Sequence, residues 1–129
     1  MPKKILLVDD DEDFRSLLAL SLRQYEFDVI TAANGEEALH LISRNVPDLM
    51  IVDLTMPVMT GWHFNIRVRE DARYMSTPII FLSGLLGNET APEESDPNTF
   101  YVPKPFDILQ LVQTIKRLLA PPGTAEFNG

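Results

Sequence analysis

The sequence predicts an α/β fold in which a parallel β-sheet lies between layers of helices. Three short apolar runs lack polar alternation, which is typical of strands buried on both faces of a sheet: Ile5 to Val8, Leu49 to Val52 and Ile79 to Leu82. Segments with apolar residues at helical spacing lie between these runs. Such alternation of strand and helix along a chain is typical of parallel sheets that helices cover on both faces.

The remaining elements follow from the same patterns. Two shorter apolar segments are expected to be edge strands, Phe27 to Thr31 and Phe100 to Val102. Helices are expected over the periodic segments Phe14 to Tyr25, Glu36 to Ser43, Trp62 to Glu70 and Ile108 to Leu119. The apolar face of the first helix is expected to consist of Phe14, Leu17, Leu18, Ser21, Leu22 and Tyr25.

This order of elements best fits a flavodoxin-like, doubly wound sheet of five parallel strands in the order 2-1-3-4-5. A fourth helix is expected between residues 85 and 99. It should be short or irregular, because this segment contains Pro92, Pro97 and several turn residues. In such sheets a ligand binds beyond the carboxyl ends of the strands, near the switch between the first and third strands.

Length and composition favour one cytoplasmic domain. A chain of 129 residues with 45% apolar residues can build a single core, expected over residues 1–120, followed by a tail or linker over 121–129 or a remnant of the expression vector. The net charge of −8 argues against nonspecific binding of nucleic acid. No cysteine is present, no apolar run is long enough to span a bilayer, and no signal peptide is visible.

Charged and polar residues follow the expected strands at their carboxyl ends. Asp9 and Asp10 follow the first strand, Asp53 the third, Ser83 the fourth and Lys104 the fifth. Two carboxylates about 4 Å apart repel each other by ~4 kcal/mol at an effective dielectric constant of about 20. One ammonium is too little to balance three carboxylates, so a hard divalent cation such as Mg²⁺ is expected there, with one carboxylate left to react.

The next acids along the chain have a simpler interpretation. Asp11, Glu12 and Asp13 stand where the first helix begins, so they are expected to cap it and to favour its dipole.

Four motifs in this order resemble those of response-regulator receiver domains, the chemotaxis-regulator-like superfamily of two-component signalling. They are Asp9-Asp10 after an apolar strand, Asp53 to Pro57 with Gly61 beyond it, Ser83-Gly84, and Lys104-Pro105-Phe106. Each motif is weak alone, but their order and spacing together are specific. The resemblance covers residues 3 to about 119.

The resemblance implies a role for each site residue. Asp53 would accept the phosphoryl group. Asp9, Asp10, Asp53 and the backbone carbonyl of Thr55 would hold Mg²⁺ or Mn²⁺, with no organic cofactor. Ser83 and Lys104 would contact phosphoryl oxygens, which they neutralise or hydrogen-bond during transfer. The bond between Lys104 and Pro105 would be cis.

The resemblance also implies a switch and its partners. A sensor histidine kinase or a phosphotransfer protein would donate the group, and Ser83 and Tyr101 would move on activation. The surface formed by the fourth helix, the fifth strand and the last helix would then control a downstream protein, an output domain outside this chain, or homodimerisation. Binding of nucleic acid or membrane by this chain is not expected. Tyr101 is equally compatible with an amphipathic residue on an edge strand.

Alternative functions remain. A receiver-like module could bind partners without phosphorylation, although the complete acceptor set argues against this. An aspartyl-phosphate phosphatase of the haloacid dehalogenase type would use Asp9 and Asp11, but the chain is short for that class and Asp53 and Lys104 would be unexplained. A flavodoxin-like cofactor binder is disfavoured because acids follow the first strand and would repel a phosphate. The expected protein is therefore a phosphoacceptor and not a turnover enzyme.

Overall fold

A computed structural model describes residues 2–53, 61–83 and 97–120 of the chain, without the side chains of 61, 62 and 83. Within these residues, five parallel strands form one sheet in the order β2-β1-β3-β4-β5. The strands are β1 Lys4–Val8, β2 Asp28–Ala32, β3 Leu49–Asp53, β4 Ile79–Ser83 and β5 Thr99–Pro103. The prediction of a flavodoxin-like, doubly wound sheet is confirmed.

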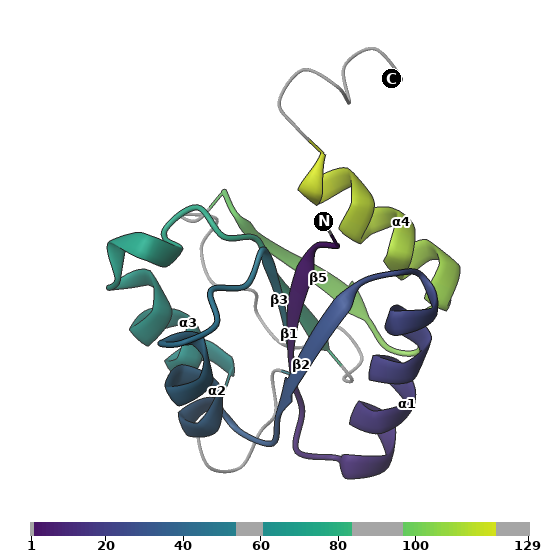
Figure 1. Cartoon of the computed structure of the whole chain (residues 1–129), viewed down its shortest axis with the longest axis horizontal. Helices are drawn as coiled ribbons and strands as arrows, with labels where there is room; N and C mark the ends of the chain where they lie inside the picture. Colours follow the sequence, from purple (N-terminus) through teal and green to yellow (C-terminus); the bar gives the residue numbers. More distant parts are fainter. Residues whose placement is uncertain (1, 54–60, 84–96, 121–129) are drawn as a thin grey trace.

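Helices cover both faces of this sheet. They are α1 Glu12–Gln24, α2 Gly35–Ile42, α3 Gly61–Arg69, the 3₁₀ helix η1 Ala72–Tyr74, and α4 Ile108–Leu119. Helices α1 and α4 lie on one face, and α2 and α3 lie on the other (Figure 1). The helix expected between residues 85 and 99 lies outside the described residues, apart from a turn at Pro97 and Asn98 that leads into β5.

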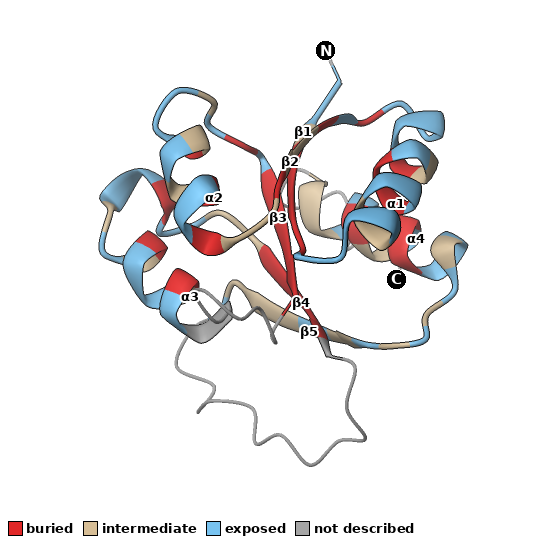
Figure 2. Cartoon of the chain, turned by 90° about the horizontal axis from the view of Figure 1, so that it is seen from below, coloured by how far each residue is buried: buried red, intermediate tan, exposed pale blue. Residues whose placement is uncertain are grey.

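The core has two halves because successive strand residues point to opposite faces of the sheet. Ile5 and Leu7 of β1 pack with the helices on one face, whereas Leu6 and Val8 pack with those on the other. Helices α1 and α4 contribute the buried residues Leu18, Ala19, Leu22, Leu111, Val112 and Ile115 to the first half. Helices α2 and α3 contribute the buried residues Ala38, Ile42, Phe64 and Val68 to the second half. Figure 2 shows this buried band along the strands and the inner sides of the helices.

The buried face of α1 differs from the expected one. Leu17 is 66% exposed and Tyr25 is 36% exposed, whereas Ala19 is buried. Successive residues of a helix are about 100° apart, so Leu17 and Ala19 lie on opposite sides of Leu18 and cannot both face the sheet. The helix turns its Ala19 side inward, where a small side chain allows close approach to the sheet.

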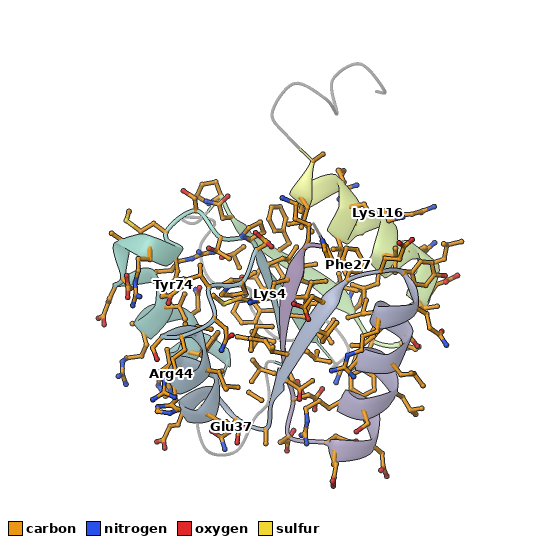
Figure 3. The ribbon with its side chains drawn as sticks, viewed as in Figure 1. Lys4, Phe27, Glu37, Arg44, Tyr74 and Lys116 are labelled. Carbon is orange, nitrogen blue, oxygen red and sulfur yellow. The ribbon has the colours of Figure 1, made fainter. Side chains whose placement is uncertain are left out.

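Two further features hold the layers in place. The hydroxyl of Tyr74, a residue labelled in Figure 3, donates a hydrogen bond of 2.7 Å to the carbonyl oxygen of Ile42 and so ties η1 to the end of α2. Pro103 ends β5, which pairs only with β4 within the described residues, so its missing N–H disrupts no ladder. No helix in the described part of the chain has the length and apolar character needed to cross a membrane.

Candidate functional site

Three carboxylates gather where β1 and β3 end. Val8 and Val52 are partners in the parallel ladder, so Asp9 and Asp53, one residue further along each strand, lie level at the same edge of the sheet. One carboxylate oxygen from each of Asp9, Asp10 and Asp53 lies within 4.8 Å of the others. Asp9 and Asp53 are buried, whereas Asp10 is exposed. The structure therefore brings together the three acids that the sequence singled out.

Asp9 is the most constrained of the three. Its Oδ1 atom accepts a hydrogen bond of 2.9 Å from the backbone N–H of Asp11, while its Oδ2 atom is buried without a hydrogen-bond partner. Burial raises the pKa of the Asp9 carboxyl to about 6; the Asp11 N–H opposes this rise, and the nearby charge of Asp53 adds to it. The site thus holds more negative charge than its protein surroundings stabilise.

Lys104 supplies positive charge to this edge from the end of β5. Its Nζ atom lies 3.5 Å from Oδ2 of Asp53, and the side chains are 27% and 7% exposed. The peptide bond between Lys104 and Pro105 is cis, the isomer that the family resemblance implies. Charge-assisted N–H···O bonds are typically about 2.7–2.9 Å long, so the ammonium lies beside Asp53 without a tight hydrogen bond.

The donor atoms fit a hard divalent cation such as Mg²⁺ or Mn²⁺. Hard cations prefer oxygen ligands, and Mg²⁺ often takes only a few carboxylates while it keeps water molecules. The buried, unpartnered Oδ2 atom of Asp9 is the structural feature that a cation would satisfy. The carbonyl of Thr55, expected as a further ligand, lies outside the described residues.

The two expected switch residues are placed in different detail. Ser83 is the last residue of β4 and pairs with Pro103 of β5. It directly follows Leu82, the residue that pairs with Asp53. The structure does not describe its side chain. Tyr101 is 38% exposed on β5, and its ring stacks on Phe81 of β4 at 5.8 Å between centroids. This position is compatible with a switch residue and with an amphipathic residue on an edge strand.

The acids at the start of α1 have the predicted capping geometry. Asp11 is the N-cap residue, and its side chain accepts a hydrogen bond of 3.1 Å from the backbone N–H of Phe14. Glu12 and Asp13 occupy the first turn, where negative charge favours the helix dipole.

The sequence did not reveal an aromatic pair beside the acids. The Nζ atom of Lys104 lies 4.8 Å from the centroid of the Phe14 ring, and the ring of Phe106 meets Phe14 edge-on at 6.1 Å. Phe14 was expected only to pack on the sheet. The two rings are separated by most of the chain, so only the folded structure shows that they meet.

Comparison with known proteins identifies the family. Residues 5–116 match the model of the response regulator receiver domain. The chain belongs to this family. The receiver domain is 35% identical over 122 residues to response regulator Rre1 of Synechocystis sp. (strain ATCC 27184 / PCC 6803 / Kazusa), with 92% of this chain and 52% of Rre1 covered. The chain spans about half the length of several curated relatives that it matches.

Solved structures share the fold of this receiver domain. The chemotaxis protein CheY4 of Vibrio cholerae superposes with a TM-score of 0.81 at 35% identity, covering 92% of this chain and 99% of CheY4. The receiver domain of sensor histidine kinase PA1611 from Pseudomonas aeruginosa, described with a magnesium ion in its active site cleft, gives a TM-score of 0.77 at 24% identity, covering 92% and 98%. Receiver domains are signalling modules and not conventional enzymes.

Proposed function

We propose that this receiver domain, over residues 1–120, accepts a phosphoryl group on Asp53 in a reaction that requires Mg²⁺ or Mn²⁺. The observation that carries the proposal is a buried Asp53 carboxylate with an ammonium 3.5 Å away and two further carboxylates in the same cluster. A sensor histidine kinase or a phosphotransfer protein is the proposed donor, since the chain belongs to the response regulator family.

Asp53 is the acid best suited to react. One oxygen of Asp9 accepts the Asp11 N–H, and Asp9 is almost fully buried, so Asp9 is better suited to hold a metal. Asp10 is exposed, and among the described ion pairs it forms no salt bridge with a lysine. Asp53 alone combines burial, the Lys104 contact and a place in the acidic cluster.

The proposed step is an in-line transfer. A carboxylate oxygen of Asp53 forms a bond to phosphorus as the bond from phosphorus to the donor nitrogen breaks, and the electron pair remains on the departing imidazole. A divalent cation held by Asp9, Asp10 and Asp53 would neutralise charge on the phosphoryl oxygens. Lys104 would pair with another of these oxygens, which requires a small displacement of its ammonium away from the Asp53 carboxylate.

The signal would leave the domain through a surface away from the acids. We place it on β5 and α4 together with residues 85–99, with Ser83 and Tyr101 as the switch residues. Exposure of Tyr101 on an edge strand supports this, because a partner can reach its ring. A downstream protein, an output domain beyond this chain, or a second phosphorylated copy would read the change. The greater length of several relatives is compatible with an output domain.

The phosphatase alternative gains no support from the geometry. It needs Asp11 as a second acid, but the Asp11 side chain caps α1 through the N–H of Phe14.

Intact-mass measurement after incubation with acetyl phosphate tests the proposal. We expect one added phosphoryl group with Mg²⁺ and none with a chelator or in the Asp53→Asn variant. Asp28→Asn is a matched control, since Asp28 is an exposed acid at the opposite end of the sheet, and it should be modified as wild type is. A folded, Mg²⁺-binding protein without an adduct would refute the proposal and favour a module that works unphosphorylated.

A further inference from the structure

We infer that Phe14 is a positioning residue of the acceptor site, and that its ring holds the Lys104 ammonium beside Asp53. This inference deepens the proposed function and rests on it. It concerns how the cation is placed, whereas the proposed function concerns which group reacts.

The ammonium of Lys104 lies between two groups of opposite character. Its Nζ atom is 3.5 Å from Oδ2 of Asp53 and 4.8 Å from the centroid of the Phe14 ring. The second distance lies inside the limit of about 6 Å at which an aromatic ring attracts a cation. Since the contact with Asp53 is longer than a tight ionic hydrogen bond, the carboxylate alone does not define where the ammonium lies.

The Phe14 ring is itself held from two directions. The Asp11 side chain accepts the backbone N–H of Phe14 and fixes the first turn of α1. The ring of Phe106 meets the Phe14 ring at an interplanar angle of 79°, the edge-to-face arrangement that aromatic pairs favour. Phe106 is only two residues beyond Lys104, so the Phe14 ring contacts the segment that follows β5 at two points.

An aromatic anchor has a property that a charged anchor lacks. Lysine is a point charge on a flexible stem, so its ammonium must be held in place to assist the transfer. When Asp53 is phosphorylated, the negative charge at this position moves from the carboxylate to the phosphoryl oxygens, so the ionic contact of Lys104 in the present structure changes. The Phe14 ring carries no net charge and takes no part in the transfer, so its attraction for the ammonium does not depend on the charge state of Asp53. Phe14 can therefore hold Lys104 in both states.

Substitutions of Phe14 separate ring electrostatics from packing. Phe14→Leu keeps an apolar side chain but removes the ring quadrupole, and Phe14→Tyr keeps the ring. Phe14→Met is a second apolar variant in case the leucine variant does not fold. Phe100→Leu is a matched control, because Phe100 is a partly buried aromatic at the other end of β5.

We expect Phe14→Leu to lower the rate constant of phosphorylation by acetyl phosphate by roughly three- to tenfold, the size of a partly desolvated cation–π contact. Phe14→Tyr and Phe100→Leu should stay within about twofold of wild type. The Mg²⁺ affinity, measured by calorimetry, should not change. In a Lys104→Ala background, the leucine substitution should have no further effect. An equal loss in that background, or in Phe14→Tyr, would overturn the inference.

A spectroscopic measurement separates this inference from the proposed function. The Nζ atom of Lys104 lies over the Phe14 ring. The NMR signals of the protons on the adjoining carbon should therefore be shifted upfield in wild type and in Phe14→Tyr, and should return to ordinary positions in Phe14→Leu. This readout needs no phosphorylation. A protein that shows the shift but takes no phosphoryl group would refute the proposed function alone. Ordinary chemical shifts for these Lys104 protons in wild type would refute the placement of the ammonium over the Phe14 ring, whatever the phosphorylation result.

Discussion

The substitution Asp9→Asn should stabilise the metal-free protein. The Asp9 carboxyl has a raised pKa, and one of its oxygens is buried without a partner. Asparagine keeps an oxygen that can accept the Asp11 N–H, and its amide can donate to the neighbouring carboxylates of Asp10 or Asp53. The change therefore removes a buried charge that the fold does not compensate.

The size of this effect follows from the pKa. The folded pKa of about 6 lies above the ordinary value of 3.8, so the folded protein holds the proton more tightly than the unfolded chain. Stability contributed by protonated Asp9 is complete below about pH 4 and is lost as the pH rises through 6. At about 1.36 kcal/mol per pKa unit, ionisation of Asp9 lowers the free energy of unfolding by about 3 kcal/mol at pH 7.5 and by about 1 kcal/mol at pH 4.5.

Urea unfolding with a chelator present measures this difference. We expect Asp9→Asn to exceed wild type in free energy of unfolding by about 3 kcal/mol at pH 7.5 and by about 1 kcal/mol at pH 4.5. The control Asp28→Asn should change stability by less than about 0.5 kcal/mol at both values. An Asp9→Asn protein that is no more stable than wild type at pH 7.5, or a difference that does not shrink in acid, would refute the reasoning.

Mg²⁺ should remove most of this difference at pH 7.5. At a concentration about one hundred times its Kd, a ligand of the folded state raises stability by about 2.7 kcal/mol. Wild type should gain this stabilisation, whereas Asp9→Asn, which lacks one carboxylate ligand, should gain much less.

Three further predictions concern the metal and the scaffold. The Mg²⁺ affinity of wild type should fall about tenfold between pH 7.5 and pH 5 in calorimetry, because protons compete for Asp9 below its pKa of about 6, and an affinity that is independent of pH would contradict this competition. Asp11→Ala should lower the free energy of unfolding by about 1 kcal/mol in urea titration, since it removes the cap of α1; an unchanged value would show that water replaces the cap. Tyr74→Phe should cost about 1–3 kcal/mol in the same titration because it leaves the buried carbonyl of Ile42 without its donor, and a neutral result would show that this bond contributes nothing.

Local patterns in the sequence were sufficient for the sheet and for the acidic cluster. Uninterrupted apolar runs such as Ile5 to Val8 indicate strands buried on both faces, and strand order then brings Asp9 and Asp53 to one edge. The cap at Asp11 also follows from local chemistry, because a carboxylate before a helix has few better partners than the free N–H groups of the first turn.

Features set by tertiary packing could not be predicted in the same way. Periodicity indicates that α1 is amphipathic, but its rotation depends on how closely Ala19 approaches the sheet, which leaves Leu17 exposed. The contact between Phe14 and Lys104 joins the first helix to the segment after the last strand, so no local pattern encodes it. The different burial of Asp9 and Asp10, adjacent in sequence, also arises only in the folded chain.

The most direct test asks which carboxylate carries the phosphoryl group. An aspartyl phosphate is reduced by borohydride to homoserine, which peptide mass spectrometry assigns to one position. After incubation with acetyl phosphate and Mg²⁺, we expect homoserine at position 53 and aspartate at positions 9 and 10. Homoserine at position 9 or 10, or at none of the three in a protein that binds Mg²⁺, would contradict the assignment of Asp53 as the acceptor.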